Sequence, residues 1–375
     1  MVYLDNAATT APSSVAIDAW KDSCKAFGNP SSVHSAGVEA NKLLRISRKI
    51  IAKTIGAKDS EIIFTPSGTF ANNLAIIGAS KALKRKGNQI IITDSEHPSV
   101  YNTAKQLEKE GFTVSCLSTC RGKINTNELN ALLNEKTVLV SVMLANNETG
   151  ALYDVAAVKR AIQQRAPNAV LHCDAVQAYM KTSFNVNTVK ADLISLSAHK
   201  IHGFKGCGAL YVKSGIRVEP ITFGGGQENG LACGTEALPA IYAFARSAEA
   251  IFPSLNDNIN KVSMLYNYAK EKLSDLGFTV NEPEKHTPYV LSVTLHKVKS
   301  EVMLNFLSSK EIYVSAGSAC SSHAKENRVL KAFGLTSNEA DTTLRISFSE
   351  DNTTDDIDIL VSALFEGINN LVKIK

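Results

Sequence analysis

Short apolar runs alternate with helical stretches between about residue 60 and residue 215 of the chain. Several runs are nearly continuous in Ile, Val and Leu, which is typical of strands covered on both faces, as in a parallel sheet. The predicted strands are 61–65, 89–93, 113–117, 138–143, 169–173, 193–196 and 209–212, with predicted helices at 127–134 and 155–164 between them. The alternation predicts an α/β domain with a mostly parallel seven-stranded sheet flanked by helices.

The pattern changes near residue 256. An amphipathic helix at 256–276 leads into short apolar runs at 289–295 and 312–314, and a final helix is predicted near 354–372. This order of elements indicates a smaller α+β domain. We therefore predict a large domain of residues 15–255 and a small domain made of residues 1–14 together with residues 256–375.

Composition narrows the class of protein. The chain has 375 residues and a formal net charge of +4, and its 40 Lys and Arg are interspersed with 36 Asp and Glu, which gives no indication of a nucleic-acid partner. No apolar run approaches the roughly 20 residues that span a bilayer, and Met1–Asn6 lacks the features of a signal peptide. Seven cysteines, an odd number, do not form a secreted disulfide framework. We expect a cytoplasmic protein without a membrane partner.

Polar clusters directly follow five of the predicted strands. They are Pro66–Thr69, Asp94–Pro98, Asn146–Gly150, Asp174–Gln177 and Ser197–Lys200. In an open α/β sheet, ligands bind at the carboxyl ends of the strands, so these clusters predict one site at that edge.

Ser67, Gly68 and Thr69 stand at the start of a predicted helix. Free backbone N–H groups and the positive end of the helix dipole suit a phosphate there, and simple N-capping is the alternative. The sequence contains no G-x-G-x-x-G and no G-x-x-x-x-G-K-[ST] motif, so nicotinamide and P-loop nucleotide sites lose their usual support.

Three ionisable residues in these clusters have specific chemical interpretations. Lys200 follows an apolar strand, where a lysine is partly desolvated as a Schiff-base lysine requires; Lys205 nearby could compete. Asp174 also ends an apolar strand, and a buried carboxylate needs a cationic partner, either a protonated pyridine nitrogen or an ordinary Lys or Arg. His97 is a candidate ligand, acid–base group or stacking ring, with a structural histidine as the alternative.

A metal site is not predicted. His199, His202 and Cys207 lie close together in sequence, but they lack the paired Cys and His spacing of structural zinc sites.

An ordered set of motifs along nearly the whole chain resembles the NifS/IscS-like cysteine desulfurases. These are pyridoxal-phosphate (PLP) enzymes of fold type I in the class V aminotransferase group. The resemblance rests on Asp5–Thr10, Gly28–His34, Glu96–Pro98, Ala145–Glu148, Asp174–Gln177, Ser197–Lys200, Gly225–Glu228, Gly234–Thr235, Ser315–Ser322 and Leu344–Ser347. It implies a PLP fold of type I with the large α/β domain and the smaller C-terminal α+β domain described above.

The resemblance also implies roles for individual residues. Lys200 forms the Schiff base with PLP, Asp174 pairs with the pyridinium nitrogen, and His97 stacks on the ring and moves protons. The further cofactor-binding residues that it implies are Gly68, Thr69, Asn147, Gln177, Ser197, His199 and Thr235. Thr235 would reach the phosphate from a second subunit, which implies a homodimer. Asn147 and Arg345 would bind the carboxylate of L-cysteine, since a guanidinium is well shaped for it.

Cys320 is implied as the sulfur acceptor, which takes the sulfur of L-cysteine as a persulfide and leaves L-alanine. The small residues Gly317, Ser318 and Ala319 before it, and the polar stretch 321–327 after it, predict a mobile loop. The final acceptor is left open between an iron–sulfur scaffold, a tRNA-thiolation enzyme and a carrier of thiamine synthesis. The positive residues Lys325, Arg328 and Lys331 suggest where an acceptor protein would bind.

Three positions depart from the family pattern. Phe70 stands where many relatives have Glu, Ala232 where Arg is common, and Cys233 where Ser is usual. Because the departures affect substrate handling first, PLP-dependent cysteine β-lyase, selenocysteine lyase and aminotransferase activities stay open as alternatives. A scaffold without catalytic activity is the remaining alternative.

Overall fold

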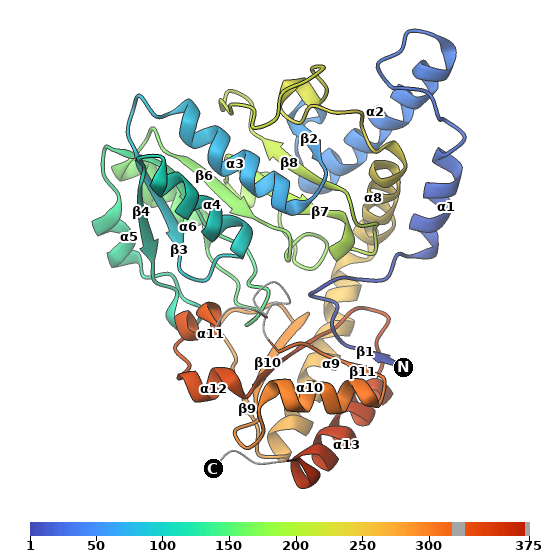
Figure 1. Ribbon diagram of the computed structural model, residues 1–375, viewed down its shortest axis with the longest axis vertical. Helices are drawn as coiled ribbons and strands as arrows, with labels where there is room; N and C mark the ends of the chain where they lie inside the picture. The colour runs from blue at the N-terminus through green and yellow to red at the C-terminus, as the bar shows by residue number, and fades with distance from the viewer. Residues whose placement is uncertain (317–326, 372–375) are drawn as a thin grey trace.

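Seven strands form one large sheet in the order β2-β8-β7-β6-β5-β3-β4 (Figure 1). The computed structural model describes residues 1–316 and 327–371. The strands are β2 (Ile62–Thr65), β3 (Gln89–Thr93), β4 (Thr113–Leu117), β5 (Thr137–Ser141), β6 (Val170–Asp174), β7 (Leu193–Ser197) and β8 (Gly208–Val212). Strand β8 pairs antiparallel with β2 and β7, and the other pairs are parallel. The predicted mostly parallel, seven-stranded sheet is therefore confirmed.

Helices cover both faces of this sheet, which explains the continuous apolar runs of its strands. One face packs on α2 (Ser35–Ile55), α5 (Thr126–Leu132), α6 (Val155–Arg165) and α8 (Leu238–Ile251). The other face packs on α3 (Gly68–Ala82) and α4 (Pro98–Lys109). Successive strand residues contribute to the two cores in turn: Ile91 packs in the first core, and Ile90 and Ile92 pack in the second. Two further helices of this part are α1 (Ser14–Ser23) and α7 (Val186–Val189).

A separate core forms around a three-stranded antiparallel sheet of order β12-β10-β9. Its elements are α9 (Leu255–Asp275), β9 (Thr279–Val280), β10 (Val290–Thr294), α10 (Ser300–Ser309), β12 (Thr343–Ser347) and α13 (Thr354–Asn370). Two short helices, α11 (Arg328–Phe333) and α12 (Ser337–Asp341), precede β12. Figure 1 shows this part below the large sheet, with α9, α10 and α13 around its strands.

The N-terminal segment joins the C-terminal part. Strand β1 (Val2–Tyr3) pairs in parallel with β11 (Ile312–Tyr313), and Val2 and Leu4 belong to the second core. We therefore propose the division predicted from the sequence, in which residues 15–255 form the large domain and residues 1–14 and 256–375 the small one.

The two longest helices of the described residues are α2 and α9, with 21 residues each. Both have one apolar face and one polar face, since their buried residues recur every three or four positions. Within residues 1–316 and 327–371, no helix is long and apolar enough to cross a membrane.

Candidate active site

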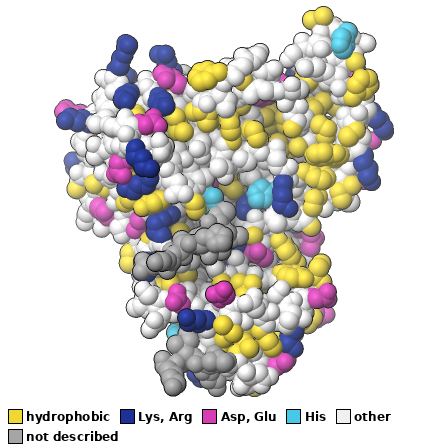
Figure 2. All heavy atoms as spheres, viewed as in Figure 1, with side chains coloured by type: hydrophobic (Ala, Val, Ile, Leu, Met, Phe, Trp, Pro, Cys, Tyr) yellow, Lys and Arg dark blue, Asp and Glu magenta, His cyan; other side chains and the backbone are white. Residues whose placement is uncertain are grey.

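A cavity of about 210 Å³ lies at the carboxyl ends of the parallel strands. It collects ten of the residues singled out in the sequence: Gly68, Thr69, His97, Asn147, Asp174, Gln177, Ser197, His199, Lys200 and Arg345. Nine come from the part with the large sheet, and Arg345 comes from β12 of the second core. Figure 2 shows this face of the molecule, with histidine and Lys or Arg side chains at the waist between the two parts.

One end of the cavity is formed by the start of α3. Ser67 caps this helix by accepting a hydrogen bond from the Phe70 N–H (3.1 Å). A Cβ atom at Gly68 would lie 2.9 Å from Val176 Cγ2, so only glycine lets the chain approach this closely. Ser197 Oγ is buried here without a hydrogen-bond partner among the described residues. Backbone N–H groups, a helix dipole and an unpaired hydroxyl together form a site for an anion.

Asp174 ends β6 in the middle of the cavity and is buried. Its carboxylate accepts hydrogen bonds from Asn72 Nδ2 (2.7 Å) and the Val176 N–H (3.0 Å). Both donors are neutral, so the negative charge of Asp174 is available to a cationic group in the cavity. Asn72 lies on α3 and had no predicted role.

His97 caps α4 and is held by Ser99. Its Nδ1 accepts from the Ser99 N–H (3.1 Å) and lies 2.7 Å from Ser99 Oγ. Because Nδ1 accepts, the neutral ring carries its proton on Nε2. Burial lowers the pKa of His97, and the positive charges of Lys200 and Arg328 lower it further. The negative charge of Asp174 raises it but is outweighed, so the neutral form is favoured. A neutral imidazole suits both ring stacking and proton transfer.

Glu96, next to His97, is fully buried and had no predicted role. Its Oε1 accepts from Thr93 Oγ1 (2.8 Å) and the Met143 N–H (2.9 Å). Burial and the charge of Asp174 raise the pKa of Glu96 to about 8, which favours the protonated acid at neutral pH. The protonated side chain bridges Thr93 at the end of β3 and Met143 just after β5, and it places no second negative charge beside Asp174.

Lys200 points at the N-terminal segment. Its Nζ donates to the backbone carbonyls of Ala7 (2.6 Å) and Ala8 (2.7 Å), and Gln177 Nε2 also donates to Ala7 (2.8 Å). The two alanines line the cavity. The sequence predicts no role for the motif that contains them, Asp5–Thr10, because a backbone carbonyl has no sequence signature.

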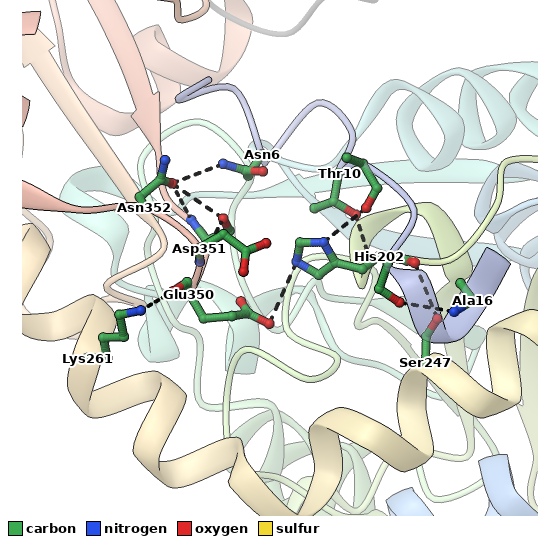
Figure 3. Close-up of polar contacts among 12 residues, drawn as sticks. Asn6, Thr10, Ala16, His202, Ser247, Lys261, Glu350, Asp351 and Asn352 are labelled. Carbon is green, nitrogen blue, oxygen red and sulfur yellow. Dashed lines mark hydrogen bonds and ion pairs between the residues drawn. The ribbon is translucent and has the colours of Figure 1, made fainter. Parts of the chain in front are cut away.

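The N-terminal segment that contacts Lys200 is fixed by a polar network, part of which is drawn in Figure 3. The His202 N–H donates to Thr10 Oγ1 (2.7 Å), and His202 Nε2 lies 3.7 Å from Glu350 Oε1. Asn6 Nδ2 lies 3.4 Å from Asn352 Oδ1 in the same view. The segment is thus tied both to the loop after Lys200 and to the chain after β12.

The His202–Glu350 pair gives a prediction for stability against pH. Burial by itself lowers the pKa of His202, but the hydrogen bond and charge of Glu350 outweigh it and raise that pKa. Because the pKa of His202 is raised in the folded state, its charge stabilises the fold by the full amount below the unfolded-state pKa of about 6.5. This stabilisation is lost as the pH rises through the folded-state pKa. The pKa of Glu350 is lowered, so its own contribution is lost in acid.

We therefore expect Glu350→Gln to destabilise the protein most between about pH 5 and 6.5, and less at higher pH. A double-mutant cycle with His202→Gln should give a coupling free energy of about 1 kcal/mol at pH 6, measured by denaturant unfolding. A coupling that is the same at pH 6 and pH 9 would contradict the assignment.

Arg345 is buried at the boundary of the two parts. Its Nη2 donates to Asp5 Oδ1 (2.7 Å) and its Nη1 to the Asn147 carbonyl (3.0 Å). Its Nε and Asn147 Oδ1 are buried without a hydrogen-bond partner among the described residues. The unpaired Arg345 Nε–H and the guanidinium charge suit a carboxylate ligand in the cavity, whereas Asn147 Oδ1 accepts and suits a donor group of the ligand.

Thr235 lies outside this cavity. It lines a neighbouring one of about 130 Å³, together with Phe70, Ala232 and Cys233. Phe70 packs against the apolar core that contains Ala232, so the departures from the family pattern lie together. The contribution of Thr235 to a second subunit stays a prediction. Cys320 lies outside the described residues.

The histidines near Lys200 have hydrogen-bond partners in the protein. His199 Nδ1 lies 3.1 Å from Thr9 Oγ1, and burial and nearby lysines lower the pKa of His199 to about 3. Burial raises the pKa of the Cys207 thiol, which disfavours a thiolate ligand. Among the described residues, no three His, Cys, Asp or Glu side chains converge as a metal site requires.

Comparison with known proteins decides the family. The model of the class-V aminotransferases matches residues 2–360. The chain belongs to this family. Within it, a cysteine desulfurase of Nostoc sp. strain PCC 7120 is 35% identical over 378 residues, which cover 99% of this chain and 94% of the relative. The predicted resemblance to the NifS/IscS-like cysteine desulfurases is confirmed.

Two solved structures are similar to this class-V aminotransferase family member over most of its length. A NifS-like protein superposes with a TM-score of 0.94 at 33% identity, covering 99% of this chain and 100% of the other. SspA in complex with cysteine gives a TM-score of 0.83 at 31% identity, covering 94% of this chain and 100% of the other. The predicted fold class is confirmed, and the family implies a PLP-type cofactor.

Proposed function

We propose that this chain is a PLP-dependent cysteine desulfurase, which converts L-cysteine to L-alanine and places the sulfur on Cys320 as a persulfide. The observation that carries the proposal is the joint placement of Lys200, Asp174, His97 and Arg345 on one cavity, in a chain of the class-V aminotransferase family. The complex of the related SspA with cysteine supports the choice of substrate.

The residues of the cavity fit a PLP group. The start of α3 with Gly68 and Thr69, joined by Ser197 and His199, would hold the phosphate. Asp174 would pair with the protonated ring nitrogen, and Lys200 would hold the cofactor covalently. Gln177 Oε1 is a buried acceptor without a hydrogen-bond partner among the described residues, and it suits a ring hydroxyl. When bound, the cofactor supplies an electron sink for charge that develops at the substrate Cα.

Lys200 and His97 are the groups that move protons. The Lys200 amine would act as a base near the substrate Cα, and the Ala7 and Ala8 carbonyls would accept its hydrogen bonds when it is charged. The proton on His97 Nε2 is available to the substrate side of the cavity, because Nδ1 is engaged by Ser99.

Sulfur transfer needs one thiol of the protein. The carbon–sulfur bond of the substrate breaks and a sulfur–sulfur bond forms at Cys320, so the sulfur atoms are oxidised by two electrons and the carbon is reduced. The hydrogen on carbon in alanine replaces the sulfur, and the persulfide retains one proton. We place this step on Cys320 because of its sequence context, Ser315–Ser322.

Arg345 and Asn147 would bind the substrate carboxylate. Arg345→Gln is expected to raise the KM for cysteine about 10- to 100-fold with a smaller change in kcat, because charge-assisted hydrogen bonds worth about 1.5–3 kcal/mol are lost. Steady-state kinetics of alanine formation measures both constants.

Asp5→Asn is the matched control for that variant. It removes the ion-pair partner of Arg345 and leaves the guanidinium in place, so its KM should stay within about threefold of wild type. Equal KM increases in the two variants would show that the structural ion pair, and not substrate binding, is affected.

We further propose a cytoplasmic homodimer with Thr235 reaching the phosphate of the partner subunit. Exposed Cys24, Cys116 and Cys120 are free thiols, which a reducing compartment preserves. The sulfur would pass to an acceptor protein, either an iron–sulfur scaffold or an enzyme of tRNA or cofactor thiolation, near the positive residues Arg328 and Lys331.

Product analysis tests the proposed function. With PLP, L-cysteine and a thiol reductant, the wild-type protein should release alanine and sulfide in equal amounts. Pyruvate in place of alanine would contradict the proposal and favour β-elimination. Comparison with L-selenocysteine as substrate separates desulfurase from selenocysteine lyase activity.

A further inference from the structure

Arg328, the first residue of α11, contacts the connection that carries His97. Its two terminal guanidinium nitrogens donate to the backbone carbonyls of Asp94 and Glu96. Both carbonyls belong to the connection between β3 and α4, and His97 is the last residue of that connection. A guanidinium satisfies two carbonyls at once because its donors form a rigid fork.

The same guanidinium stacks on α4. Arg328 Cζ lies 4.1 Å from the ring centroid of Tyr101, which is four residues after His97 on the first turns of α4. A cation over an aromatic face is attracted by the ring quadrupole while its N–H groups remain free to donate in the plane. Arg328 therefore contacts the chain on both sides of His97.

The residue before Arg328 makes a second attachment to the cavity rim. Asn327 Nδ2 donates to Glu148 Oε2 (2.8 Å), and Asn327 Oδ1 caps α11 by accepting from the Leu330 N–H (3.1 Å). Glu148 follows Asn147, which lines the cavity. Through Arg328 and Asn327, the start of α11 is thus attached to two of the connections at the carboxyl ends of the sheet. Figure 1 shows α11 below the large sheet.

We propose that Arg328 is a positioning residue for His97, fixing the connection at residues 94–97 and thereby the imidazole that faces the cavity. The inference rests on the proposed function in one respect, namely that His97 moves protons. It adds a specific link between α11, in the C-terminal part of the chain, and the acid–base group on the large sheet.

Charge supports the same assignment. The charged groups that act on His97 are Asp174, Lys200 and Arg328, and burial is the largest cause of its lowered pKa. The positive charge of Arg328 disfavours the imidazolium, so removal of that charge should raise the His97 pKa.

The test compares Arg328→Gln, Arg328→Lys and Arg121→Gln. Arg121 is a matched control, because its guanidinium stacks on Phe333 of α11 (5.7 Å from Cζ to the ring centroid) and, among the described residues, has no hydrogen bond or ion pair with the connection at 94–97. Arg328→Gln should lower kcat for alanine formation roughly 10- to 100-fold with KM nearly unchanged, as misplacement of a catalytic group does. Arg328→Lys should restore part of the loss, and Arg121→Gln should match wild type.

The second readout is the His97 pKa, measured by NMR on the protein without cofactor and labelled with ¹³C-histidine. It should rise in Arg328→Gln and stay at the wild-type value in Arg328→Lys and Arg121→Gln. Should Arg328→Gln fail to fold, Tyr101→Leu removes the stacking partner alone and is expected to lower kcat in the same direction.

Two results would overturn the proposal: wild-type kcat in the folded Arg328→Gln variant, or an unchanged His97 pKa in it. A failure of the proposed function gives a different result from either of these outcomes. In that case the wild-type protein forms no alanine, whereas the NMR titration of the cofactor-free protein still decides whether Arg328 acts on His97.

Discussion

Replacement of Lys200 by alanine is expected to lower alanine formation from cysteine by about four orders of magnitude, the upper range for loss of a positioned acid–base group that also anchors the cofactor. The residue has two tasks in the proposed mechanism, covalent attachment and proton transfer, and no other lysine within residues 1–316 and 327–371 lines the cavity. Lys181 is fully buried away from the cavity, and Lys205 is exposed.

Lys205→Ala is the matched control, because it removes an amine five residues away and leaves the cavity intact. It should retain wild-type kcat. A readout independent of turnover is borohydride reduction of the protein with PLP, followed by peptide mass spectrometry, which should find the cofactor on the Lys200 peptide. Activity in Lys200→Ala within tenfold of wild type would refute the assignment, as would attachment at Lys205.

Asp174→Asn is expected to lower kcat about 100- to 1,000-fold, in line with removal of one preorganised electrostatic group from a buried site. The amide is nearly the same size as the carboxylate but carries no charge to pair with a protonated ring nitrogen. It also presents an NH₂ group toward one of two donors, Asn72 Nδ2 and the Val176 N–H, that now serve the carboxylate. Steady-state kinetics and the affinity for PLP measure the two effects.

Asp192→Asn is a suitable control for a buried carboxylate. Asp192 accepts from the Leu171 N–H (2.9 Å) and pairs with Lys159, outside the cavity. Its replacement should lower the free energy of unfolding and leave kcat per folded molecule unchanged. If both variants lost the same activity, loss of stability rather than loss of the Asp174 charge would be the cause.

The sheet and most of the cavity could be predicted from sequence because both follow from local rules. Continuous apolar runs identify strands that are covered on both faces, and the helices of the two cores do cover them. Parallel strands bring their carboxyl ends to one edge, so the polar residues after β2, β3, β5, β6 and β7 had to meet. The boundaries are less exact: the run predicted as a strand at 138–143 corresponds to β5, which is Thr137–Ser141.

The other features of the fold and of the site depend on contacts between distant parts of the chain, which no local sequence pattern encodes. The carbonyls of Ala7 and Ala8 reach Lys200 on a segment that is held by the pairing of β1 with β11 and by the contacts of Asn6 and Thr10. Strand β8 runs antiparallel to β7 after the connection at residues 198–207, although its apolar run resembles those of the parallel strands. Glu96 was indistinguishable from a solvated carboxylate until burial was known.

The departures from the family pattern gain a partial explanation. Phe70 and Ala232 both line the cavity of Thr235, next to the candidate active site, so an aromatic ring and a small apolar residue lie together there. Nothing in the structure explains the choice of Cys233 over serine.

The position of the sulfur after a single turnover tests the central claim most directly. Protein with PLP is mixed with a stoichiometric amount of L-cysteine without reductant, and free persulfides are alkylated and located by peptide mass spectrometry. We predict one added sulfur atom on the Cys320 peptide, an equal amount of alanine, and none of this sulfur in Cys320→Ser. Sulfur on exposed Cys116 or Cys120, or pyruvate with free sulfide, would contradict the account.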